Sequence, residues 1–431
     1  SYFDATDYSF AEQVWAQTTD PQVKADFAAL VRFLAKDRLD SLRAGSGMKE
    51  WMLYHSGETP QSTEELPEHL LRRITDTHVL GQKGMTLLRT EPGPAPQTSL
   101  VRYGPVLNHG HYDALNINYF GLGYELTYDL GYSNGATHTQ VGWAKTTAAH
   151  NTVMVDEAKQ GTGSEDIKGG SMHMTAAMPG LQATDVDSNG IYKSKNCDLY
   201  RRFLALVGHG PDSYLLDIFN VRGGQQHDYL LHALSDRISF EGVQMSERAD
   251  GSVAGPDYNW GERQMNDGFL SGVPHRPYWT APPGNGLGFL MHPRSGDGDQ
   301  LWRATWSLLD SENDQFRLTM LPQENTEVVN AWAPGIYPHY PKAEYVMARR
   351  SGEDLSSTFV GLMEPYGPPL HGGGIHAQEL VSAASTDDGV IKYIGGHDVV
   401  LFQADAIGGE MHVDLELEEA GRYYFVIRPY Q

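Results

Sequence analysis

Residues that commonly bind divalent metals are concentrated between positions 108 and 151 of the chain. The run Asn108-His109-Gly110-His111-Tyr112-Asp113 is followed by Asp129 at the end of one apolar, alternating segment and by His150-Asn151 just before the next. Zinc takes imidazole nitrogens and carboxylate oxygens in a four-coordinate shell. The pattern predicts that His111, Asp129 and His150 bind one zinc ion between neighbouring strands, with His109 left over for chemistry.

The sequence between these residues predicts how they would meet. Two β-type runs flank Gly121-Leu122-Gly123, which has the composition of a tight hairpin turn. An antiparallel hairpin would return the chain from His111 to Asp129, and His150 would enter from the following segment. The alternative is that each of the three is a hydrogen-bonded structural residue, because a chain with 18 histidines places several near carboxylates by chance.

Length and composition limit the class of protein. The 431 residues can bury a large core in one big β unit or in more than one structural unit, and 47 Gly and 23 Pro indicate a turn-rich globular chain. No segment approaches the roughly 20 uninterrupted apolar residues of a membrane span. The formal net charge of −23 argues against nucleic-acid binding, which needs Lys and Arg to neutralise phosphates. The single cysteine, Cys197, excludes an internal disulfide and leaves the compartment open.

Helical periodicity is confined to the N-terminal part of the chain. Apolar residues recur every three or four positions over 8–43, with Asp20-Pro21 as the start of a second helix and Ala44-Gly45 as its stop, and a short helix covers 67–74. After about residue 76 the period changes to two. The expected strands are 85–89, 115–120, 124–129, 151–156, 200–207, 213–221, 228–234, 301–308, 316–321, 358–363, 399–404 and 423–429.

A dozen strands without intervening helical periods predict an antiparallel β-sandwich. The expected fold class is therefore mainly β, with a large antiparallel sandwich preceded by a few α-helices. We expect a helical segment over residues 1–75 and a β-sandwich domain over residues 76–431 that carries the metal site.

Three motifs within residues 108–157 carry a family resemblance. They are His109-Gly110-His111-Tyr112-Asp113-Ala114-Leu115-Asn116, Gly123-Tyr124-Glu125-Leu126-Thr127-Tyr128-Asp129-Leu130-Gly131-Tyr132 and Gly142-Trp143-Ala144-Lys145-Thr146-Thr147-Ala148-Ala149-His150-Asn151. Together they resemble the C-terminal β domain of heparinase II/III-like polysaccharide lyases, and most of all the exolytic oligoalginate lyases. The resemblance implies Zn2+ as cofactor, with His111, Asp129 and His150 as its ligands, and a catalytic role for His109.

The sequence differs from the family in two features, a catalytic tyrosine and an N-terminal toroid. The position that the oligoalginate lyases give to a catalytic tyrosine is Ala136 here, and Tyr132 or His138 could take its place, with Tyr132 the better placed by sequence. The family has a long (α/α) toroid before the β domain. Residues 1–75 look like the last helices of such a toroid, so the chain is expected to be a fragment or to work with an N-terminal toroid domain or chain.

A lyase of this kind acts on an acidic oligosaccharide, and several residues could hold one. Asn108 could donate or accept a hydrogen bond to the substrate, or only fix the turn beside the ligands. Trp143 could stack its flat apolar face on a sugar ring, or pack in the core beside His150. Cations for the substrate anions could come from Arg201 and Arg202, with Lys193 and Lys195, or from Arg349-Arg350, although such pairs are commonly solvated.

The favoured function is cleavage of a uronate oligosaccharide by β-elimination, with alginate oligomers preferred on the Trp-Ala-Lys-x-Thr-x-x-His-Asn run. The alternatives are a glycosaminoglycan lyase for heparan-type or chondroitin-type chains, and a non-catalytic carbohydrate-binding or structural sandwich with a structural zinc. A zinc hydrolase is a minor alternative because three protein ligands leave one position open. We expect a periplasmic or secreted protein, with no recognisable leader at Ser1.

Overall fold

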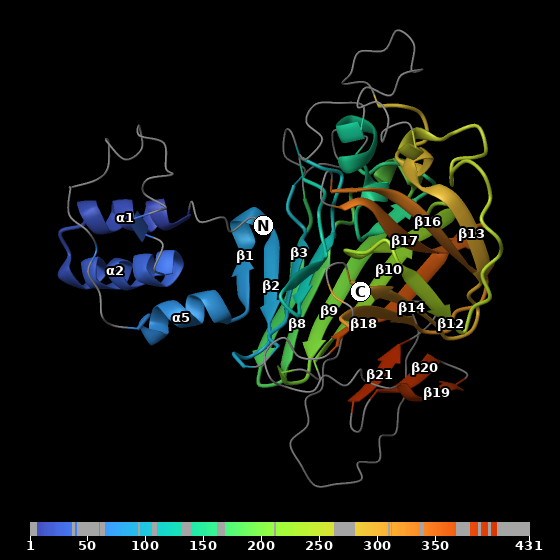
Figure 1. Ribbon diagram of the computed structural model, residues 1–431. Coiled ribbons are helices and arrows are strands. Elements are labelled where there is room, and N and C mark those ends of the chain that lie inside the picture. Colours follow the sequence, from blue (N-terminus) through green and yellow to red (C-terminus); the bar gives the residue numbers. More distant parts are fainter. Residues whose placement is uncertain are drawn as a thin grey trace. The chain divides into compact units, whose positions relative to one another are not determined.

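The computed structural model divides into two compact units, Ser1–Asp76 and Thr77–Gln431 (Figure 1). It describes residues 7–36, 39–40, 60, 65–93, 95–105, 110–131, 139–161, 169–210, 213–262, 281–308, 311, 313–336, 340–367, 380–386, 389–394 and 398–402. Within these residues the helices are too short or too polar to cross a lipid bilayer.

The first unit is helical, as its apolar periodicity predicts. Its described helices are α1 (Asp7–Gln17), α2 (Pro21–Ala35) and α5 (Glu68–Thr75). Asp20 caps α2 by accepting hydrogen bonds from the backbone N–H groups of Gln22 and Val23, so the predicted start is confirmed. α2 ends at Ala35, where the backbone at Lys36 turns to a positive φ of 51°. The predicted stop at Ala44-Gly45 lies outside the described residues.

The second unit consists of antiparallel sheets, which confirms the predicted fold class. The strands are β1 (His78–Leu80), β2 (Met85–Arg89), β3 (Thr98–Arg102), β4 (Ile117–Gly121), β5 (Tyr124–Thr127), β6 (Val153–Val155), β7 (Met172–Met178), β8 (Leu181–Asp187), β9 (Leu199–Val207), β10 (Tyr214–Arg222), β11 (Gln226–His232), β12 (Ile238–Glu241), β13 (Met291–Asp297), β14 (Trp302–Ser307), β15 (Gln315–Met320), β16 (Thr326–Ile336), β17 (Tyr340–Ser351), β18 (Ser356–Tyr366), β19 (Leu380–Thr386), β20 (Gly389–Ile394) and β21 (Asp398–Phe402). Their order is β1-β2-β3-β4-β5 in one sheet, β12-β14-β15-β18-β10-β9-β8-β7 in the largest, β13-β16-β17-β11-β6 in a third and β19-β20-β21 in a fourth.

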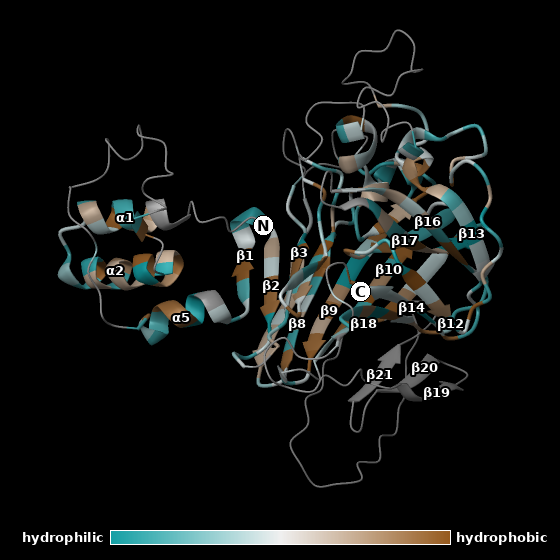
Figure 2. Cartoon of the chain, viewed as in Figure 1, coloured by the Kyte–Doolittle hydropathy of each residue, from teal (hydrophilic) through white to brown (hydrophobic). Residues whose placement is uncertain are grey.

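The main hydrophobic core joins the eight-stranded sheet to both five-stranded sheets. Its buried residues include Leu88, Val101, Ile117 and Tyr119 from the first sheet, Leu204, Leu215, Phe219, Trp306 and Phe359 from the largest, and Tyr229, Leu231, Val328 and Val346 from the third. Figure 2 shows this apolar content along β8 and β9. Burial of so many large side chains is the dominant favourable term in folding, and it fixes the sheets as a sandwich.

The sheet β13-β16-β17-β11-β6 is buried on both faces. Along β11, Tyr229 and Leu231 belong to the main core, whereas Leu230 belongs to a second core on the other face. That second core also contains Tyr128 and Leu130, which flank Asp129. The segments that carry the predicted metal ligands are therefore anchored by apolar contacts to the outer face of this sheet.

Several strands lie where the sequence predicted none, notably β16 and β17. A strand buried on both faces carries apolar residues at successive positions, so its period-two signal is weak. Val328 and Val329 show this, because they are neighbours in β16 and are buried in different cores. The strand expected over 423–429 lies outside the described residues.

Candidate metal centre

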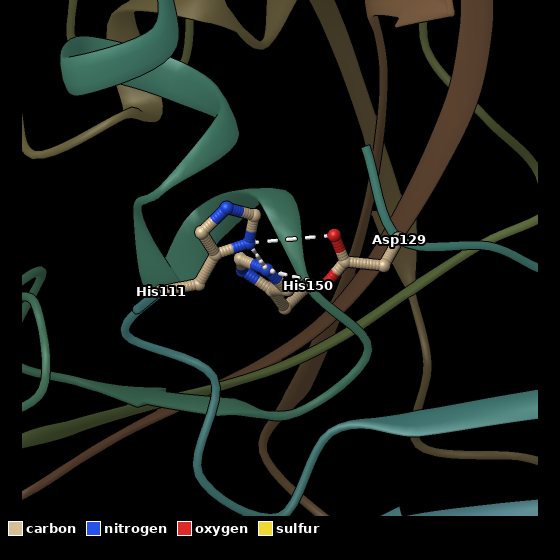
Figure 3. A group of neighbouring side chains, drawn as sticks. All are labelled: His111, Asp129 and His150. Atoms are coloured by element: carbon tan, nitrogen blue, oxygen red, sulfur yellow. Dashed lines mark hydrogen bonds and ion pairs between the residues drawn. The ribbon is translucent and has the colours of Figure 1, made fainter. Parts of the chain in front are cut away.

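His111, Asp129 and His150 come together at one point, as the sequence predicts (Figure 3). Nδ1 of His111 lies 3.3 Å from Oδ1 of Asp129, Nε2 of His150 lies 3.1 Å from Oδ2 of Asp129, and the two ring nitrogens lie 3.1 Å apart. All three side chains are buried or nearly so. Within the described residues they are the only group of three histidine, cysteine or acidic side chains with such converging atoms.

The β4–β5 hairpin delivers Asp129 to this point. Its turn residues Leu122 and Gly123 both have positive φ, 56° and 82°, which is the backbone of the tight two-residue hairpin expected from the sequence. Asp129 lies two residues after the end of β5, and its Oδ1 accepts a hydrogen bond from the N–H of Gly131 at 2.6 Å. The short turn thus sets the register that places this carboxylate opposite the loop of His111.

A 3-10 helix over Thr147–Ala149 delivers His150, and one hydrogen bond fixes the state of its ring. Nδ1 of His150 lies 2.7 Å from the carbonyl oxygen of Thr146, so Nδ1 carries the proton and donates it. In the neutral ring the lone pair is then on Nε2, which faces Asp129 and His111. A lone pair that faces a carboxylate is repulsive unless a proton or a cation lies between them.

The donor set fits a zinc ion. Donor atoms of a tetrahedral shell with bonds of about 2.0–2.2 Å lie about 3.3–3.5 Å apart, close to the separations found between these three side chains. The bond from His150 to the Thr146 carbonyl is the outer-shell contact that metal-binding histidines commonly make. His111 would bind through Nδ1, His150 through Nε2 and Asp129 through its carboxylate.

The electrostatics of the group agree with a cation or proton at its centre. Burial by itself would raise the pKa of Asp129, but the two imidazoles outweigh burial and hold that pKa well below its ordinary value. Burial would lower the pKa of His150, but Asp129 outweighs it and raises that pKa. The carboxylate therefore stays charged, and a metal ion would compete with a proton for His150.

Residues 82–209 match the heparinase II/III-like C-terminal family model. The chain also resembles the heparan sulfate lyase HepC from Pedobacter heparinus, with a TM-score of 0.55 at 13% identity over 94% of this chain and 49% of that one. A heparinase III gene product gives a TM-score of 0.54 at 13% identity over 93% of this chain and 47% of that one. The chain thus spans about half the length of these structures, and no curated protein sequence matches it.

The matched segment contains His111, Asp129 and His150, and a buried network that extends to His232 holds their loops. Asn151, next to His150, is fully buried: its N–H donates to Asn116, and its side-chain oxygen accepts from the N–H of His232. His232 in turn lies 2.9 Å from the Tyr128 carbonyl oxygen, and burial lowers the pKa of His232 to about 3. By its sequence position Asn151 could either bind substrate or fix the turns beside His150, and the structure shows that it fixes these turns.

A buried arginine ties the same loops to the eight-stranded sheet. The Arg202 guanidinium has no exposed surface and forms two hydrogen bonds with Asp217, at 2.9 and 2.6 Å. It also donates to the backbone carbonyls of Leu115 and Asn151. Arg202 is therefore a structural residue of the heparinase II/III-like segment, which corrects the prediction that it lines a substrate cleft.

Two other arginines that were predicted to bind substrate anions also form ion pairs with carboxylates. Arg201 donates from Nε to Asp185 at 2.9 Å, and Arg349 donates from Nε to the fully buried Asp228 at 2.7 Å. Paired guanidinium groups of this kind have their charge neutralised within the protein. The predicted role of these two arginines in holding substrate anions is therefore unsupported.

Of the predicted catalytic and substrate-binding residues other than the cations, only Trp143 lies within the described part of the chain. Trp143 is fully buried, stacks on Phe289 with a centroid distance of 5.8 Å and donates its indole N–H to the Pro334 carbonyl oxygen. Since a buried ring offers no face to a sugar, the prediction that it stacks on substrate is corrected to core packing. Asn108, His109 and Tyr132 lie outside the described residues, as do Ala136 and His138.

Proposed function

We propose that the intact protein is a polysaccharide lyase that cleaves uronate-containing glycosaminoglycans by β-elimination. The observation that carries the proposal is the convergence of His111, Asp129 and His150 inside a segment that matches a heparinase II/III-like family model. A binding site with two imidazoles and a carboxylate suits Zn2+, and we propose zinc as the resident metal.

The reaction needs a base, an acid and a way to hold negative charge. The base removes the proton from C5 of the uronate, the bond from C4 to O4 breaks, a double bond forms between C4 and C5, and the departing O4 takes up a proton. We propose His109 as the base, because an imidazole titrates near neutrality, and Tyr132 as the proton donor to O4. When bound, the metal supplies a fixed positive charge that keeps the neighbouring loops in place.

Substrate preference is where the proposal departs from the sequence-based expectation. Alginate was favoured on one run around Trp143, but that residue is packed in the core, and the similar structures named above are a heparan sulfate lyase and a heparinase III. These likenesses favour the glycosaminoglycan alternative. Heparan-type oligosaccharides are accordingly the first substrates to test, with chondroitin-type and alginate oligomers beside them.

The test is to incubate the intact gene product with heparan sulfate, chondroitin sulfate and alginate oligomers and follow the absorbance of the new C4–C5 double bond. We expect absorbance to rise fastest with a glycosaminoglycan. A rise with alginate alone would reverse the substrate assignment. No rise with any uronate would refute the lyase proposal and leave the non-catalytic carbohydrate-binding or structural sandwich.

Two variants separate catalysis from metal binding. His109→Ala should abolish turnover while metal content and thermal unfolding stay as in the parent protein, because we propose His111, Asp129 and His150 as the metal ligands. His209→Ala is the matched control, since His209 is 70% exposed and pairs with Glu91. Full activity in His109→Ala would rule out the proposed base.

A further inference from the structure

Two lysines beside the metal centre differ from the other cations of this acidic chain. Across the described residues, most arginines of the second unit pair with a carboxylate, as Arg202, Arg222 and Arg317 do. Lys145 and Lys159 form no ion pair there. Both are half-buried rather than fully exposed. A half-buried ammonium group that has no carboxylate as an ion-pair partner can bind an anionic ligand.

Tyr112, the residue that follows His111, contacts the side chain of Lys159 and the backbone of Lys145. The Lys159 ammonium lies 5.1 Å from the centre of the Tyr112 ring, within the range of a cation–π contact. The Tyr112 N–H donates to the Lys145 carbonyl oxygen at 2.9 Å. The two lysines, together with the predicted ligand His111, thus belong to one small region of the fold.

Hydrogen bonds from Gln160 fix the backbone that carries Lys159. The buried Gln160 side chain accepts from the Ala114 N–H at 2.7 Å and donates to the Ala114 carbonyl oxygen at 3.1 Å. Its own N–H donates to the Thr147 hydroxyl at 3.0 Å. The chain at 159–160, the loop of His111 and the helix before His150 are therefore joined, so the ligand-binding geometry is set before any ligand arrives.

The two carboxylates nearest the predicted metal site already have cationic or imidazole partners. Asp113 forms an ion pair with Arg102, and Asp129 faces two imidazoles. The positive charges of Lys145 and Lys159 are therefore not neutralised by these two carboxylates. A bound divalent metal would add positive charge, which raises the local concentration of anions.

We propose that Lys159 and Lys145 form an anion subsite that holds an acidic group of the oligosaccharide next to the metal centre. The inference rests on the proposed function for the identity of the ligand. Its chemistry is that of a carboxylate or sulfate accepting hydrogen bonds from ammonium groups. Such a subsite would explain how a chain with a net charge of −23 can bind a polyanion.

The test measures binding separately from cleavage. A size-defined heparan sulfate hexasaccharide is titrated calorimetrically into the intact protein and into Lys145→Gln, Lys159→Gln and the double variant. Each single change should raise Kd about tenfold, which is the cost of losing one charge-assisted hydrogen bond. Lys159→Arg should retain binding within about threefold, because the charge remains.

The matched control is Lys342→Gln, an equivalent change at a 41% exposed lysine that lies 3.7 Å from Glu344. Binding by this variant should equal that of the parent protein. Carboxyl-reduced and desulfated hexasaccharides then show whether the lysines bind a carboxylate or a sulfate. The hexasaccharide that lacks the bound group should have the same weak affinity for the parent protein and for the double variant.

The outcomes distinguish this inference from the proposed function. Kd values for Lys145→Gln and Lys159→Gln equal to that of Lys342→Gln would overturn the subsite while leaving the lyase proposal standing. Lysine-dependent binding without any C4–C5 double bond would support the subsite and refute the lyase. Metal content and thermal unfolding that match the parent protein show that each variant is folded. No binding by the parent protein would overturn the subsite, and the absorbance test with the other uronates would still decide the lyase proposal.

Discussion

Replacing Arg202 by Met should destabilise the second unit and also weaken metal binding. The side chains of Arg202 and Asp217 have no exposed surface, so the change leaves a buried carboxylate without its partner. Breaking a buried ion pair in this way costs about 3–5 kcal/mol. The Tyr229 hydroxyl still donates to Asp217 at 2.7 Å but cannot neutralise its charge.

The effect on the metal follows from the two carbonyls that Arg202 holds. One belongs to Leu115, a buried residue with a positive φ of 58°, a conformation that costs a branched side chain about 1–3 kcal/mol. The other belongs to Asn151, next to His150. Without the guanidinium these loops can relax, and we expect zinc affinity to fall about tenfold or more, as for outer-shell partners of metal ligands.

The assay combines urea unfolding of the metal-free protein with zinc titration against a chromophoric chelator. Arg222→Met is the matched control, because the Arg222–Asp198 pair is 41% and 62% exposed and such pairs contribute about 0–1 kcal/mol. The double variant Arg202→Met/Asp217→Leu should be more stable than Arg202→Met, since no charge remains buried. It should not recover the zinc affinity. Equal effects of Arg202→Met and Arg222→Met would refute the reasoning.

Two further perturbations test the centre and the core. If zinc is the resident metal, the parent protein should bind it stoichiometrically and unfold at a higher temperature with zinc present, because metal bound only to the folded state stabilises it. His111→Ala or Asp129→Ala should abolish both effects, and zinc retained by both variants would exclude this site. His227 is fully buried, and burial lowers its pKa to about 4, so between pH 6.5 and 4 the unfolded state binds more protons and about 3 kcal/mol of stability is lost as the pH falls. His227→Gln should reduce the slope of this pH dependence in urea unfolding by about one proton, while the contribution of His232 remains. An unchanged slope would show that His227 does not contribute.

The class of fold and the identity of the three converging residues could be predicted from the sequence alone. Period-two runs require sheets, and Gly123 beside Leu122 requires a hairpin turn, so the return of Asp129 toward His111 follows from local rules. The cap at Asp20 is equally local. The N-terminal helices and most of the strands in the heparinase II/III-like segment could be read in the same way.

Which polar and aromatic residues are buried could not be predicted from the sequence, because burial depends on tertiary packing. Arg202 and Trp143 have the residue types of a substrate site, yet one holds loops from inside the core and the other packs on Phe289. Lys145 and Lys159 carry no sequence signal beyond their charge. Whether a cation is neutralised depends on carboxylates that are distant in sequence, and pairing of distant strands brings those together.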